Sequence, residues 1–142
     1  MLRTAYAVML VTSFAVSSAA APITDWKQIK KTLDGIPTAA GNSLTKRLES
    51  CKITMHKEAS WMETLAVARP EYGAKPGQTV LKIVFDLPPP PKQSGPSLPQ
   101  PPQRNVPAVW IIDHGKASAV SAWANVLQNR PVPLGYDESN NC

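Results

Sequence analysis

The stretch TVLKIVFDL, residues 79–87, decides the fold class of this sequence. It is rich in β-branched and aromatic residues, which favour a strand, and Pro88 ends it. Alternate side chains of a strand point to opposite faces. One face is therefore apolar throughout (positions 81, 83, 85 and 87), whereas Lys82 and Asp86 interrupt the other. The sequence predicts a strand that packs on a core through its apolar face.

A second strand is predicted for VPAVWIID, residues 106–113. Pro107 lacks an N–H, so we expect the start of this strand to lie at an edge or outside the hydrogen-bonded ladder. The two strands are joined by PPPPKQSGPSLPQPPQRN, residues 88–105, in which eight of 18 residues are proline. This composition is typical of polyproline II or disordered chain, so we expect an exposed proline-rich loop or linker.

Two helices are predicted before these strands. Residues 24–34 place their apolar side chains on one helical face, and Gly35 follows as a stop signal. Residues 42–51 show a similar pattern and begin with a capping residue, Asn42 or Ser43. The N-terminal part of the domain is therefore expected to be helical.

The segment between these helices and the first strand is harder to interpret. Residues 52–58 alternate with a period of two, which favours a half-buried strand, but no breaker separates them from the preceding helix and a continued helix is the alternative. Residues 61–68 fit a strand or a helix. Residues 71–78 contain two Gly and one Pro and predict a turn.

After the second strand, Asp113, His114 and Gly115 are expected to turn the chain. Residues 116–130 carry an apolar stripe and are predicted to form the clearest helix of the sequence. Together the segments predict a small single α+β domain over residues 21–142. It would combine N-terminal helices, a short antiparallel sheet of two to four strands, a packed C-terminal helix and the proline-rich loop.

Residues 1–20, MLRTAYAVMLVTSFAVSSAA, have the order of a secretory signal peptide: an early charge, a short apolar stretch and a small-residue end. The apolar stretch of roughly 12 residues is too short to span a bilayer comfortably. We expect cleavage after Ala20, with an uncleaved anchor or a buried N-terminal helix as the alternatives. The expected location is secreted or periplasmic, with no membrane span after signal removal.

The charge pattern does not point to nucleic acid. The chain has 15 Lys and Arg, 10 Asp and Glu, and a formal net charge of +5. The densest basic cluster, Lys27, Lys30 and Lys31, is flanked by Asp25 and Asp34. A solvated helix face explains this cluster, and no nucleic-acid partner is expected.

Cys51 and Cys142 are the only cysteines. In an oxidising compartment an even count favours a disulfide within the chain. Such a bridge would close a loop of about 90 residues and contribute up to about 4–5 kcal/mol. The alternatives are a bridge to another chain through Cys142 and a buried, unbonded Cys51.

Candidates for catalysis or metal binding are few. His56 and His114 are far apart, no set of three or four ligands has a metal-site spacing, and no phosphate-binding or nucleophile motif is present. We therefore expect no metal, no cofactor and no catalytic residue. Asp113 and His114 follow an apolar strand, where catalytic residues often occur, but the sequence favours an ordinary turn with Asp113 as a helix cap and His114 as a loop residue.

The proline-rich segment is the candidate interaction element. Pro99, Pro102 and Arg104 form a P-x-x-P motif followed by a basic residue, which suits an aromatic groove beside an acidic pocket. The alternative is a stiff spacer. We interpret the chain as an exported, non-enzymatic interaction protein with a protein partner: a secreted effector, a periplasmic accessory factor or an inhibitor. A small secreted hydrolase using Asp113 and His114 is the alternative function.

Overall fold

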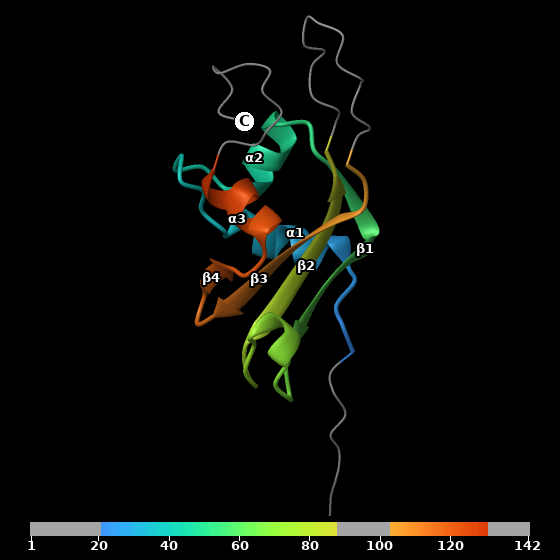
Figure 1. The fold of residues 1–142 in the computed structure, drawn as a ribbon, viewed down its shortest axis with the longest axis vertical. Helices are drawn as coiled ribbons and strands as arrows, with labels where there is room; N and C mark the ends of the chain where they lie inside the picture. Colours follow the sequence, from blue (N-terminus) through green and yellow to red (C-terminus); the bar gives the residue numbers. More distant parts are fainter. Residues whose placement is uncertain (1–20, 88–102, 131–142) are drawn as a thin grey trace, which may run out of the picture.

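The computed structural model describes residues 21–87 and 103–130 (Figure 1). Four strands form one antiparallel sheet in chain order: β1 (Thr54–Thr64), β2 (Thr79–Asp86), β3 (Val106–Asp113) and β4 (Lys116–Ala119). Helices α1 (Trp26–Asp34) and α2 (Leu44–Ser50) precede the sheet, and α3 (Ala122–Asn129) follows it. The predicted α+β single domain is confirmed, with four strands.

The two N-terminal helices begin at capping side chains. Asp25 Oδ1 accepts a hydrogen bond from the Lys27 amide, and Ser43 Oγ accepts one from the Lys46 amide. These bonds satisfy amides that have no partner inside a helix. Gly35 is the C-terminal cap of α1. Both predicted helices are therefore confirmed, with ends shifted by one or two residues.

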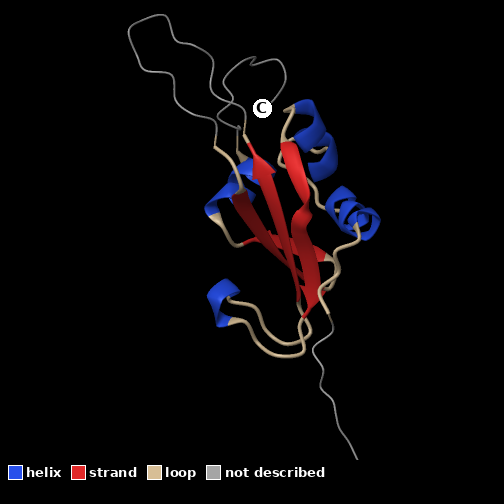
Figure 2. Ribbon diagram, turned by 90° about the vertical axis from the view of Figure 1, so that its right-hand side faces the viewer, coloured by secondary structure: helices blue, strands red, loops and turns tan. Residues whose placement is uncertain are grey.

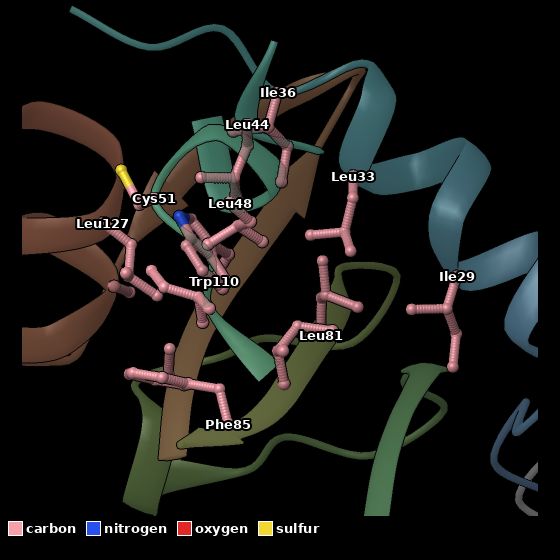
Figure 3. Close-up of a cluster of buried hydrophobic side chains, with 14 of the residues drawn as sticks. Ile29, Leu33, Ile36, Leu44, Leu48, Cys51, Leu81, Phe85, Trp110 and Leu127 are labelled. Carbon is pink, nitrogen blue, oxygen red and sulfur yellow. The ribbon is translucent and has the colours of Figure 1, made fainter. Parts of the chain in front are cut away.

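The main core lies between the helices and one face of the sheet (Figure 3). The face of β2 that was predicted to be apolar is fully buried there. All three helices contribute side chains to the same cluster, whose largest members are Ile29, Leu33, Ile36, Leu44, Leu48, Leu81, Ile83, Phe85, Trp110 and Leu127. Burial of this one contiguous set against the sheet is what positions the helices.

Gln128 ties three parts of the fold together from α3. Its Oε1 accepts a hydrogen bond from Trp110 Nε1 on β3 at 3.1 Å, and its Nε2 donates to the carbonyl of Pro37 at 3.1 Å. Its own carbonyl accepts from the amide of Ala39. The connection between α1 and α2 is therefore fixed to both α3 and the sheet.

The opposite, outer face of the sheet is covered along one half. The connection between β1 and β2 contains the 3-10 turn η1 (Pro70–Tyr72) and projects at one end of the sheet (Figure 2). Trp61 and Tyr72 form an edge-to-face pair there, with ring centroids 6.3 Å apart. Arg69 Nη2 lies 3.0 Å from the buried Glu63 carboxylate. Because the connection covers this part of the sheet, Val80 is also buried, although it lies on the face that was expected to be more exposed to solvent.

Strand β1 settles the two ambiguous segments. Residues 54–64 are extended, so the alternating pattern of 52–58 belongs to a strand and not to a continued helix. The strand ends at Thr64, and the rest of the 61–68 segment belongs to the connection with η1. The turn predicted for residues 71–78 lies in that same connection.

The helix predicted for residues 116–130 is only half right. Lys116–Ala119 is strand β4, and α3 begins at Ala122 with Ser121 as its cap. The cause is the two-residue turn at His114 and Gly115, whose φ angles of 50° and 78° match a type I′ hairpin. This turn sends the chain back along β3, so residue 116 starts a strand.

Several predictions fall outside the described residues. The signal peptide of residues 1–20 and the proline-rich stretch 88–102 lie there, as do residues 131–142. Pro107 can be placed: it pairs with Val84 of β2, whereas β4 pairs with β3 only from Trp110 onward. Among the described residues no strand pairs with β3 beside Pro107 on that side, so the position that lacks an N–H lies at an edge of the sheet, as expected.

Candidate functional site

The uncovered half of the outer sheet face carries a polar cluster. His56 of β1 and Asp86 of β2 lie at its centre, with Glu58 beside His56. Arg104, just before β3, adds a positive charge that acts on Asp86. We refer to these four residues as the polar cluster.

A large β-bulge in β1 shapes this cluster. His56 pairs with Val84 and Trp61 pairs with Lys82, so five steps along β1 match two steps along β2. Ser60, 1% exposed, bridges the bulge: its Oγ accepts from the Val84 amide at 3.1 Å and donates to the His56 carbonyl at 2.8 Å.

Both nitrogens of the His56 ring face a carboxylate. Nε2 lies 2.9 Å from Asp86 Oδ1, although its N–H does not point along that line, so the contact is bent. Nδ1 lies 3.4 Å from Glu58 Oε1. Both side chains of the closer pair are about one quarter exposed, so water reaches the pair from one side.

These contacts shift the two ionisation equilibria in opposite directions. The pKa of His56 is raised, chiefly by hydrogen bonding to Asp86, and further by the negative charges of Asp86 and Glu58. The pKa of Asp86 is lowered, first by the contact with His56 and then by the amide of Asn105. The charged pair is therefore favoured over the neutral one.

Asp86 also closes the base of the segment that joins β2 to β3. Its Oδ1 accepts a hydrogen bond from the Asn105 amide at 2.7 Å. The Leu87 amide donates to the Gln103 carbonyl at 2.8 Å. The two ends of residues 88–102 are therefore held side by side at one end of the sheet, next to the polar cluster.

The polar cluster consists of charged side chains that interact with one another beside the base of residues 88–102. Each ring nitrogen of His56 lies within 3.5 Å of a carboxylate oxygen, so both nitrogens have charged neighbours within the cluster. The nearby Ser60 hydroxyl is buried and hydrogen-bonded on both sides, so it does not fit the role of a nucleophile. In residues 21–87 and 103–130, no group of three or more His, Cys, Asp or Glu side chains has the arrangement of a metal site.

The residues of the alternative hydrolase lie at the opposite end of β3. Asp113 and His114 belong to the β3–β4 hairpin turn, and the His114 side chain is 97% exposed. The two side chains approach to 3.5 Å, and Asp113 also accepts a hydrogen bond from Gln78 at 3.2 Å. An exposed two-residue turn offers no enclosure for a substrate, and it lends the hydrolase no support.

The other residues singled out in the sequence are only partly placed. Cys51 is 3% exposed at the C-terminal end of α2, within the main core (Figure 3). Its predicted partner Cys142 lies outside the described residues, so the pairing stays a prediction. Pro99 and Pro102 also lie outside them, whereas Arg104 is exposed at the base of the hairpin.

Comparisons with known proteins give no relative for this chain. No family model matches it, and no curated protein or solved structure does so either. Within the described part of the chain, no helix has the length and apolar character needed to cross a membrane.

Proposed function

We propose that this chain is an exported, non-enzymatic binding protein that presents residues 88–102 to a protein partner outside the cytoplasm. The observation that carries the proposal is the closed base of this segment. Leu87 and Gln103 are hydrogen-bonded across it, and Asp86 holds Asn105. A segment rich in proline, held at both ends by a sheet, loses little conformational freedom when it is bound.

The polar cluster supports the same proposal. It places His56, Glu58, Asp86 and Arg104 at the base of the proline-rich segment, where a bound partner would contact them. Arg104 is exposed and follows the P-x-x-P motif of Pro99 and Pro102. We propose that the partner carries an aromatic groove for the prolines and an acidic pocket for Arg104.

The test replaces residues 88–102 with a Gly/Ser linker of the same length, which keeps the loop-closure entropy nearly unchanged. We expect the free energy of unfolding to stay within about 0.5 kcal/mol of the parent value. Capture of proteins from the native extract, quantified by mass spectrometry, should lose the partner. The variant Arg104→Ala should weaken the same capture, whereas Lys116→Ala, an exposed basic residue at the other end of the sheet, should not.

Two outcomes would contradict the proposal. If the linker variant captures the same proteins as the parent, residues 88–102 are a spacer. If its stability collapses, the prolines belong to the packed domain. Export is tested separately: N-terminal sequencing of protein recovered outside the cytoplasm should begin at Ala21, and a mature chain that retains Met1 would refute the signal peptide.

A further inference from the structure

Helix α2 carries a buried arginine for which the described residues supply too few partners. Arg47 is 7% exposed and lies on the helix between the core residues Leu44 and Leu48. Its guanidinium reaches the C-terminal end of α3, where Nη2 donates to the carbonyl of Arg130. A buried arginine at a junction of two helices is unusual, because charged side chains are seldom fully buried without a partner.

The contacts of Arg47 are incomplete. A guanidinium has five N–H donors, and its Nε is buried with no hydrogen-bond partner. Within the part of the chain that the structure describes, none of the ion pairs involves Arg47. Burial lowers its pKa, as expected for a charge removed from water. The site therefore calls for an acceptor, and a carboxylate matches the planar fork of the guanidinium best.

The chain itself supplies a suitable occupant. Arg130, whose carbonyl contacts Arg47, is followed by PVPLGYDESNNC, residues 131–142. This tail contains Asp137 and Glu138 but no Lys or Arg. Seven residues of extended chain reach at most about 25 Å, so either carboxylate can return to the point where the tail begins.

The predicted disulfide would bring the far end of the tail to the same place. Cys51 lies one helical turn after Arg47, which is about 6 Å along the helix axis. A Cys51–Cys142 bridge would therefore confine the tail to a loop that starts and ends beside Arg47. We propose that residues 131–142 dock at the junction of α2 and α3, with a carboxylate of Asp137 or Glu138 paired with the Arg47 guanidinium.

The first test follows the Nε–H signal of Arg47 by NMR in the oxidised mature protein. Neutralising the tail with Asp137→Asn and Glu138→Gln should shift this signal and speed its exchange with water roughly tenfold. Glu71→Gln, which neutralises an exposed carboxylate on η1, should change neither quantity. An unchanged Nε–H signal in the neutralised tail variant would overturn the proposal.

The second test is a double-mutant cycle on the unfolding equilibrium. Tail neutralisation should lower the folding equilibrium constant roughly tenfold with Arg47 present and hardly at all with Arg47→Met. Arg47→Gln, which also removes the positive charge, replaces Met if that variant does not fold, and the NMR test needs neither. Additive effects would overturn the proposal. So would an Nε–H signal that ignores the tail but responds to added hexaglutamate, because the occupant would then be a partner and not this chain.

Discussion

Ser60 occupies the place where the ladder between β1 and β2 is interrupted. Its hydroxyl uses both of its hydrogen-bonding roles, accepting from Val84 and donating to His56. The shape of the bulge, and with it the position of His56, therefore depends on one side-chain oxygen.

Ser60→Ala should destabilise the fold by about 1–3 kcal/mol, because the Val84 amide and the His56 carbonyl would both lose their hydrogen bond to the hydroxyl. Chemical denaturation measures the change in the free energy of unfolding. Ser118→Ala, at an exposed position on β4, is the matched control and should stay within about 0.5 kcal/mol. Equal effects of the two substitutions would mean that the hydroxyl does not hold the bulge.

The contact of His56 with Asp86 makes stability depend on pH. Because the pKa of His56 is raised in the folded state, its contribution is complete below its unfolded pKa of about 6.5 and is lost as the pH rises through the folded pKa. The lowered pKa of Asp86 acts in the other direction: its contribution is present above about pH 4 and is lost in more acidic solution. The pair therefore stabilises the fold most between about pH 4 and 6.5.

The measurement compares the free energy of unfolding of the parent and of His56→Gln across pH 4–9. We expect the difference to be largest between about pH 4 and 6.5 and to shrink as the pH rises through the raised pKa of His56. Asp86→Asn keeps an oxygen for the Asn105 amide but removes the charge, so it should abolish most of this dependence. A difference that is flat across the whole range would show that the two side chains are not coupled.

The sequence predicts that His56 and Asp86 lie on strands, but it does not predict that the two side chains contact each other. Alternation assigned His56 and Asp86 to the polar faces of two strands. Which residues face each other depends on the register, and the bulge between His56 and Trp61 shifts it by three positions. No local pattern reports such an insertion, so the pairing could not be read from the sequence.

One predicted helix was partly wrong because a tight turn outweighed a helical sequence pattern. Lys116–Ala119 contains two alanines and a lysine, all good helix formers, and the apolar stripe of the following residues matched a helix. The turn at His114 and Gly115 decided otherwise, because two consecutive residues with positive φ reverse an extended chain. Strand β2, with no competing signal, was predicted to within one residue.

Substitutions in the turn at His114 and Gly115 can distinguish a structural role of these residues from a catalytic one. Gly115→Ala should destabilise the fold by about 1 kcal/mol, because an L side chain disfavours its φ of 78°. His114→Asn should be nearly neutral, since Asn tolerates positive φ and the histidine ring is exposed. Thermal unfolding measures both, with Gly35→Ala, at a φ of −84°, as the control for adding a methyl group to a glycine.

If the protein hydrolyses a substrate through His114, His114→Asn should abolish that activity while leaving the melting temperature unchanged. If the protein instead binds a partner through residues 88–102, His114→Asn should capture as much of that partner as the parent does. A loss of capture in this variant would move the binding surface to the other end of the sheet.

The Gln128 side chain connects parts of the molecule that are distant in sequence. Gln128 links α3, β3 and the connection between α1 and α2 through Trp110 and Pro37. Gln128→Leu keeps the volume but leaves a buried indole N–H and a carbonyl unpaired. We expect a loss of about 2 kcal/mol or more in the free energy of unfolding. Asn129→Leu, on the exposed side of the same helix, should cost far less.

The chain-order sheet has a consequence for how the domain folds. Each strand pairs with its neighbour in sequence, so most strand contacts are local and favour rapid folding. The entropic cost of closing the connection between two paired strands nevertheless differs from one hairpin to the next. β3 and β4 are joined by two residues, whereas residues 87–105 separate β2 from β3, and this longer connection adds about 2 kcal/mol of closure entropy. The β3–β4 hairpin should therefore nucleate early, and the union of the two halves across the proline-rich segment should set the folding rate.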